Sequence, residues 1–226
     1  MGCLLKGGGG LYARLVVGAV LLAAGEAKRL GGRPKALLEL AGVPLIRRNL
    51  VALSGAGVDE VVVVLGHRAD EIEPAVCDFP VTLVRNPDYA KGQATSVRAG
   101  LAALSGKLDA IVVAVADQPL INTQDVAALI GAYKKRTSGS ILVPYVDGER
   151  ANPIVLEAAL REEILAGDVS FGCRQWSAQH PERIARFDTD NRHYRVDLDT
   201  PEDLQQFERR YGHALRWPTE SLARSA

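Results

Sequence analysis

The sequence predicts an α/β protein of three layers, in which helices cover both faces of a mostly parallel, Rossmann-like sheet. The first observation is that short apolar runs, at residues 16–22, 61–65 and 111–115, alternate with segments whose apolar residues recur at helical spacing. The second is that these runs are continuously apolar, as in parallel strands buried on both faces. The third is the length of 226 residues, which suits one large domain.

The domain limits and the expected surroundings of the protein follow from composition. We expect one domain over residues 15–211, between a disordered leader (1–14) and a flexible tail (212–226). Because 27 basic residues balance 27 acidic ones, net charge favours neither a nucleic acid nor an anionic membrane as a partner. No apolar stretch is long enough to span a bilayer. Three scattered cysteines without a C-x-x-C pair indicate a reducing, cytoplasmic setting.

The first half of the chain has the β-α-β order. Strands are expected at 16–22, 61–65 and 81–84, and helices after Pro44 and at 69–77. The helix after Pro44 is indicated by Ile46, Leu50 and Leu53, which fall on one helical face.

The second half continues the alternation. Helices are expected from residue 93, from residue 122, at 157–165 and, less regularly, within 167–184; strands are expected at 111–115, 140–145 and 184–187. Near the C-terminus, period-two alternation predicts a further strand at 196–199, with Asp197 and Asp199 on one face. Thr200 and Pro201 then start a helix, Thr200 as its cap.

A loop suited to phosphate follows the first strand. The small residues Ala23, Ala24 and Gly25 allow backbone N–H groups to approach a ligand closely, and Arg29 and Lys35 bring positive charge to the same place. A P-loop is excluded because Lys35 is not followed by Ser or Thr. A dinucleotide fingerprint is excluded because the glycine run near the N-terminus precedes the strand. The loop is therefore a third kind of phosphate-binding loop, suited to the triphosphate of a nucleotide.

The pattern LAAG, a few residues, Arg, an apolar residue, Gly and then Lys resembles the signature of the MobA-like nucleotidyltransferases. This family includes the molybdenum cofactor cytidylyltransferases and guanylyltransferases. The resemblance covers residues from about 16 to about 211 and implies the three-layer Rossmann-like nucleotidyltransferase fold. Ala27 and Leu30 depart from it, since relatives usually carry Ser and Met there. Ala151 in the segment GERANP replaces the usual Gly of an element that lines the acceptor side.

The resemblance also implies the residues of the site. Catalytic roles fall to Arg29, Lys35 and Asp117; contacts with the nucleotide or acceptor fall to Leu22, Ala23, Ala24, Gly25, Gly31, Gln93, Thr95, Ser96 and Asn152; Mg²⁺, with Mn²⁺ as an alternative, is held by Asp117 together with Asp197 or Asp199. The residues alone leave other readings open. The three polar side chains at 93–96 suit a helix cap, Asp117 a turn, and the later aspartates a solvated strand edge.

The function implied is transfer of CMP from CTP to molybdopterin with release of pyrophosphate. Within the family LAAG resembles the cytidylyl enzymes, and the methyl group of Ala24 restricts the space for a purine. Three alternatives remain: a sugar phosphate or methylerythritol phosphate as acceptor, a non-catalytic chaperone that delivers cofactor to a molybdenum hydroxylase, and a relative adapted to redox chemistry. Cysteines and histidines show neither metal-ligand nor nucleophile spacing and are expected to be structural.

Overall fold

The computed structural model describes residues 14–218. The predicted leader up to residue 13 and the tail from residue 219 lie outside the described residues. Arg14 at the start of the described part pairs with Asp59 at 2.6 Å.

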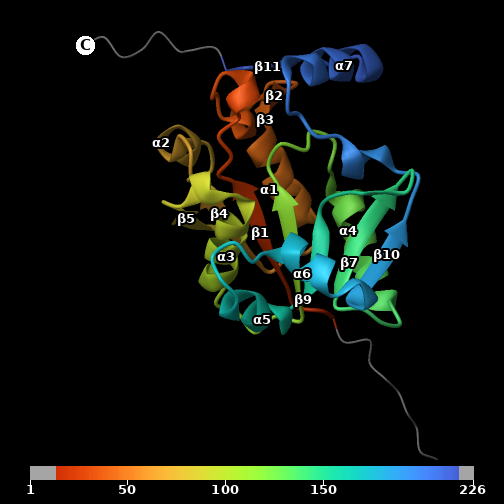
Figure 1. Cartoon of the computed structure of the whole chain (residues 1–226). Helices are drawn as coiled ribbons and strands as arrows, with labels where there is room; N and C mark the ends of the chain where they lie inside the picture. The colour runs from red at the N-terminus through yellow and green to blue at the C-terminus, as the bar shows by residue number, and fades with distance from the viewer. Residues whose placement is uncertain (1–13, 219–226) are drawn as a thin grey trace, which may run out of the picture.

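A mixed sheet forms the centre of the molecule (Figure 1). Its strands lie in the order β10-β7-β9-β6-β1-β4-β5, and β8 pairs with β7 at the side. In chain order they are β1 (Val17–Ala23), β4 (Glu60–Leu65), β5 (Thr82–Arg85), β6 (Ala110–Val115), β7 (Ile141–Val146), β8 (Glu149–Arg150), β9 (Ile154–Glu157) and β10 (Ile184–Asp188). Strand β1 is central and parallel to both neighbours, with Val20 beside Val62 of β4 and Val113 of β6.

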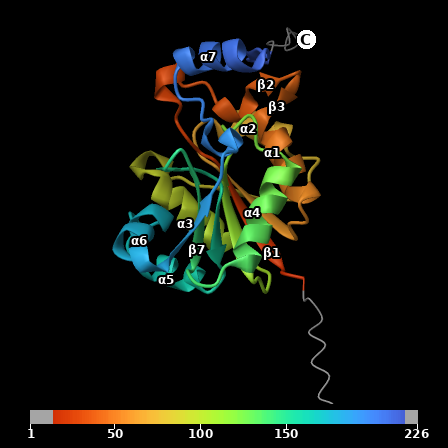
Figure 2. The ribbon, with the colours of Figure 1, turned by 90° about the vertical axis from the view of Figure 1, so that its right-hand side faces the viewer.

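Helices cover both faces of this sheet (Figure 2). One face carries α1 (Leu45–Gly55) and α4 (Thr123–Lys135), and the other carries α3 (Gln93–Ala103), α5 (Leu160–Ala166) and α6 (Cys173–Gln179). Successive residues of β1 serve the two cores, because side chains alternate along a strand. Leu21 packs into the core with α1 and α4, whereas Val20 packs into the core with α3.

A small additional layer lies at the carboxyl end of the sheet. Helix α7 (Pro201–Tyr211) packs there beside an antiparallel sheet of β2 (Glu39–Leu40), β3 (Val43–Pro44) and β11 (Leu215–Arg216). A separate apolar cluster holds this layer together; its buried members are Leu38, Leu40, Leu45, Leu198 and Phe207.

The predicted three-layer α/β class with a mostly parallel sheet is confirmed. The predicted helix 69–77 is shorter, because α2 (Ala69–Ile72) passes into a 3-10 turn at Glu73–Ala75. The sequence analysis missed β9, which runs antiparallel between β6 and β7.

The predicted strand at 196–199 is wrong. A 3-10 helix spans Arg192–Arg195, and residues 196–199 pair with no strand in the described chain. The N–H group of Asp199 instead bonds to Asp203 in the first turn of α7 (2.9 Å). Within residues 212–218, the described part of the expected tail, Leu215 and Arg216 pair with β2.

Among the described residues, none of the helices combines the length and apolar character needed to cross a lipid bilayer.

Candidate active site

The loop after β1 curls tightly at the carboxyl end of the sheet. Ala27 adopts φ +48° and begins a 3-10 helix over Lys28–Leu30. The N–H groups of Leu30 and Gly32 both bond to the Ala27 carbonyl oxygen, at 2.8 and 3.1 Å. Positive φ is costly for a residue with a Cβ, so Ala27 carries local strain that the two hydrogen bonds offset. His67 contacts the Gly32 carbonyl oxygen from β4's side (2.9 Å), which holds the loop against the sheet.

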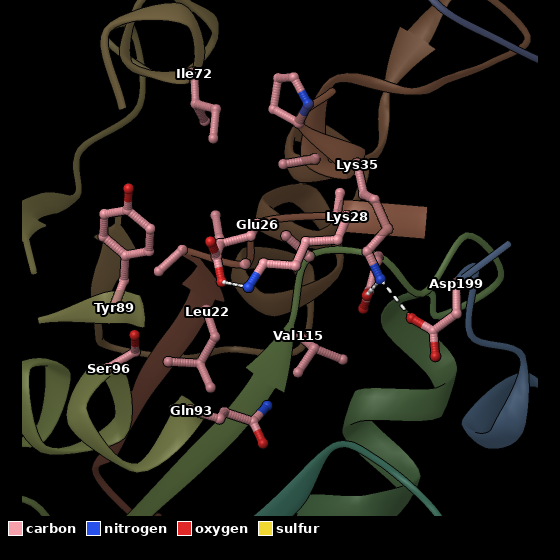
Figure 3. Close-up of a pocket in the computed structure, with 18 of the residues that line it drawn as sticks. Leu22, Glu26, Lys28, Lys35, Ile72, Tyr89, Gln93, Ser96, Val115 and Asp199 are labelled. Carbon is pink, nitrogen blue, oxygen red and sulfur yellow. Dashed lines mark hydrogen bonds and ion pairs between the residues drawn. The ribbon is translucent and has the colours of Figure 1, made fainter. Parts of the chain in front are cut away.

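Lys35 joins two carboxylates that are far apart in the sequence. Its Nζ lies 2.5 Å from Asp117 Oδ2 and 2.7 Å from Asp199 Oδ1 (Figure 3). Asp117 follows β6 by two residues, so the carboxyl end of that strand positions it. Burial opposes the charged form of Lys35, but the two carboxylates outweigh burial and raise its pKa. The ammonium group is therefore held as a cation at the centre of an acidic pair.

Asp197 is the third carboxylate near this bridge. The residue is exposed, yet protein atoms crowd its carboxyl group. Desolvation, followed by the charges of Asp117 and Asp199, raises the pKa of Asp197 to about 6. Neighbouring negative charges disfavour one another's ionised form. A further positive charge bound beside these three carboxylates would therefore be stabilised.

Two carboxylates of the bridge are possible ligands for a metal ion. In the described part of the chain, no three His, Cys, Asp or Glu side chains are grouped so as to hold a metal ion. Asp117 and Asp199 nevertheless converge on one cationic atom, and carboxylate oxygens are the ligands that Mg²⁺ and Mn²⁺ prefer. The pair fits one hard divalent ion whose remaining ligands come from phosphate and water.

Two cavities adjoin at this site. The first, of about 420 Å³, is lined by Leu22, Ala23, Ala24, Gly25, Glu26, Ala27, Lys28, Arg29, Pro34, Lys35, Ala36, Ile72, Tyr89, Gln93, Ser96, Val115, Ala116, Asp117 and Asp199. The second, of about 690 Å³, is lined by Leu22, Lys91, Gly92, Gln93, Ala94, Val97, Val113, Val115, Glu149, Arg150, Ala151, Asn152, Ile154, Ser170, Gly172, Cys173, Arg174 and Gln175. Leu22, Gln93 and Val115 line both cavities. The cleft can therefore hold two ligands side by side, one against the loop and one against a more basic wall.

The comparison with protein families agrees with this geometry. The MobA-like NTP transferase domain matches residues 19–184. The chain belongs to the MobA-like NTP transferase family. The predicted resemblance is thereby confirmed.

The names of the similar proteins indicate different activities. The chain is 33% identical over 195 residues to nicotine blue oxidoreductase of Paenarthrobacter nicotinovorans, covering 83% of this chain and 94% of that protein. It is 34% identical over 146 residues to the bifunctional protein GlmU of Kineococcus radiotolerans, covering 63% of this chain but only 29% of that protein.

Solved structures share the fold. A nucleotidyl transferase from Methanothermobacter thermautotroptrophicus superimposes with a TM-score of 0.70 and 26% identity, covering 87% of this chain and 97% of that one. A Mycobacterium tuberculosis H37Rv protein in complex with manganese superimposes with a TM-score of 0.66 and 21% identity, covering 85% and 97%. The predicted nucleotidyltransferase fold is thus confirmed.

Most residues that the sequence singled out lie together in this MobA-like site. The first cavity takes Leu22, Ala23, Ala24, Gly25, Arg29, Lys35, Gln93, Ser96, Asp117 and Asp199, and the second takes Asn152. Gly31, Thr95 and Asp197 line neither cavity. The buried Thr95 hydroxyl donates to the Gly92 carbonyl oxygen (2.8 Å) and accepts from Asn86 (2.9 Å). Thr95 therefore stabilises the start of α3.

The sequence analysis did not predict several residues at or beside the site. Tyr89 and Ile72 line the first cavity on the side opposite Asp199 (Figure 3), and neither belongs to a motif. Gln118, which is 1% exposed, follows Asp117 and donates from Nε2 to the Tyr194 carbonyl oxygen (2.7 Å). The adjacency to Asp117 was the one available signal for Gln118.

The raised pKa of Asp197 makes a prediction for stability. The ordinary value is 3.8 and the folded value about 6, so the folded state binds this proton more tightly. The tighter proton binding stabilises the folded state fully below pH 4, and this stabilisation is lost as the pH rises through 6. Above pH 6 wild type must keep a charged Asp197 in an unfavourable place, and Asp197→Asn removes that cost. We therefore expect the free energy of unfolding of the metal-free variant, compared with wild type, to be higher at pH 8 than at pH 4. Allowing for solvent screening, the gain is roughly 1 kcal/mol.

Urea unfolding of both proteins at pH 4 and pH 8 measures this difference. Asp190→Asn, which changes an exposed carboxyl earlier in the chain, is the control, and its stability relative to wild type is expected to be the same at both pH values. An equal difference between Asp197→Asn and wild type at both pH values would contradict the prediction.

Proposed function

We propose that this protein transfers CMP from CTP to molybdopterin, releasing pyrophosphate and forming a molybdopterin cytosine dinucleotide. The observation that carries the proposal is the bridge of Asp117, Lys35 and Asp199, which lines the first of two adjoining cavities. A transferase needs such a place, because two substrates must meet where charge on phosphate is stabilised.

The nucleotide is assigned to the first cavity. Its phosphates would lie against the loop, where Arg29 and Lys35 supply positive charge. The base would lie toward Tyr89 and Ile72, since these apolar side chains form the far wall. Ala24 also lines this cavity. Its methyl group takes up space that a glycine would leave free, which favours a pyrimidine over the larger purine.

The acceptor is assigned to the second cavity. Lys91, Arg150 and Arg174 line it, against one carboxylate from Glu149, so its wall attracts an anionic ligand. Apolar residues such as Val97 and Ile154 form the floor, which suits a ring system. Ala151 is 7% exposed, and its methyl group narrows the cavity relative to the usual Gly.

The chemistry needs no protein nucleophile. A phosphate oxygen of the acceptor attacks the α-phosphorus of CTP, and the bond from that phosphorus to the β-bridging oxygen breaks, so that pyrophosphate leaves with the electron pair. An ionised phosphate is already a nucleophile, and the protein contributes positioning and charge. Asp117 and Asp199 would hold Mg²⁺, which supplies charge neutralisation at the phosphates. Arg29 and Lys35 offset the negative charge that grows on pyrophosphate.

Pyrophosphate release tests the proposal. Purified protein is incubated with Mg²⁺, molybdopterin and, in turn, CTP, GTP, ATP or UTP; release with CTP is expected. Arg174→Gln serves as the matched variant, since Arg174 lines the acceptor cavity but not the nucleotide cavity. It should raise KM for molybdopterin and leave KM for CTP unchanged. Nucleotide binding without release would favour the chaperone, and release with a sugar phosphate in place of molybdopterin would favour that acceptor.

One comparison favours a second candidate function. Because the nicotine blue oxidoreductase from Paenarthrobacter nicotinovorans shares 33% identity over most of both chains, an oxidoreductase activity on nicotine blue in the same cleft is the second candidate. Its test is the absorbance of nicotine blue with a reduced nicotinamide or flavin as electron donor, without any nucleoside triphosphate. Bleaching by wild type, and not by buffer, would establish it over the transferase.

A further inference from the structure

The bridge between Lys35 and Asp199 joins residues 164 positions apart. The side chain of Asp199 is 57% exposed. A pair of this kind is weak when its side chains must be ordered at the moment of contact. Something else in the fold must therefore hold the two residues in place.

Asp199 is held by the C-terminal part of the chain. Leu198, directly before it, is fully buried in the separate apolar cluster that also contains Phe207. Asp203 Oδ2 accepts hydrogen bonds from the N–H groups of Asp199 (2.9 Å) and Thr200 (2.8 Å). The first turn of α7 and the cluster thus fix the backbone that carries the Asp199 carboxylate.

The same part of the chain also grips the loop that carries Lys35. Strand β11 pairs with β2, placing Arg216 beside Glu39 and Leu215 beside Leu40. The guanidinium group of Arg33 lies 4.2 Å from the centre of the Trp217 ring, a favourable cation–π geometry. These contacts flank Lys35 on both sides in the sequence.

We propose that residues 198–217, here called the C-terminal clamp, are a positioning device that sets the Asp199 carboxylate against the Lys35 ammonium group. The clamp acts through backbone and apolar contacts, and Asp203 and Trp217 are its positioning residues. It contributes no atom to the cavities apart from Asp199. Its consequence for catalysis rests on the proposed function, whereas its effect on Lys35 does not.

The reactivity of Lys35 toward an amine-acylating reagent tests the clamp. Acylation of metal-free, full-length protein is followed by mass spectrometry, relative to the exposed Lys107. Asp203→Ala and Trp217→Ala each loosen one side of the clamp. We expect the relative rate at Lys35 to rise about fivefold in each, which corresponds to losing an interaction of about 1 kcal/mol. Asp199→Asn gives the rate when this contact is lost.

Leu104→Ala is the matched control for general destabilisation. Leu104 is 1% exposed and packs near Gly18 at the amino end of β1, away from the site. It should lower the melting temperature without changing Lys35 reactivity. Unchanged Lys35 reactivity in both clamp variants, or an equal rise in Leu104→Ala, would overturn the proposal.

Nucleotide affinity separates the clamp from the proposed function. If the clamp variants show the Lys35 effect while wild type binds no magnesium nucleotide, the proposed function fails and the clamp stands. If wild type binds the nucleotide and the clamp variants show neither a weaker affinity nor the Lys35 effect, the clamp fails and the function stands.

Discussion

Asp117→Asn is expected to lower the rate of pyrophosphate release by about a hundredfold to a thousandfold, the usual cost of losing one group that stabilises transition-state charge. The substitution keeps the shape of the side chain but removes the charge that faces Lys35 at 2.5 Å. An amide oxygen is also a weaker ligand than a carboxylate for a hard cation. The turnover number should therefore fall, and the Mg²⁺ concentration needed for half-maximal rate should rise.

Asp109→Asn is the matched control for Asp117→Asn. Both aspartates flank β6, but Asp109 lies at its amino end, where it accepts a hydrogen bond from the Val16 N–H group (2.8 Å). Steady-state kinetics of the two variants under a Mg²⁺ titration make the measurement. Full activity in Asp117→Asn would show that this carboxylate is not needed for the reaction. An equal loss of activity in Asp109→Asn would show that the effect arises from a general loss of stability.

Lys35→Met is the second substitution for which we expect a large effect. Without the ammonium group, the carboxylates of Asp117 and Asp199 face each other with Asp197 nearby. Their mutual repulsion lowers the melting temperature of the metal-free protein. Transfer should also slow about a hundredfold or more, because charge on the departing pyrophosphate loses its partner.

The two effects of Lys35→Met respond differently to Mg²⁺. A divalent ion on the carboxylates stabilises the folded state by mass action, so it should raise the melting temperature of the variant more than that of wild type. It should not restore the rate. Lys35→Arg, which keeps the charge but changes its geometry, should retain the melting temperature and part of the rate. A melting temperature of Lys35→Met equal to wild type, with no added response to Mg²⁺, would contradict this account of the bridge.

Most of the regular elements could be predicted because their signals are local. The strand at 111–115 is a continuous apolar run, and β6 spans Ala110–Val115. The helix expected from residue 122 has an equally local signal: α4 begins at Thr123, and the Asn122 side chain accepts from the N–H groups of Gln124 and Asp125 as its cap. Such signals need only a few neighbouring residues, so tertiary contacts do not override them.

The errors came where a local signal competed with a distant one. The period-two pattern at 196–199 is real, but a strand also needs a partner, and α7's first turn takes the Asp199 N–H group instead. Strand β9 was missed because its four residues, Ile154–Glu157, merge with the helix pattern that follows. Thr95 was ambiguous from the sequence, and only its contacts with Gly92 and Asn86 show its structural role.

The sequence by itself determined most of the alternation of strands and helices, the loop after β1 and the family, because each depends on residue types at short spacing. The tertiary structure decided which charged groups meet. Lys35 finds Asp117 and Asp199 only when β6 and α7 are packed beside the loop, and the second cavity exists only when residues 149–154 and 170–175 approach α3. Distances between residues remote in sequence depend on the summed packing of the whole domain, which no local pattern encodes.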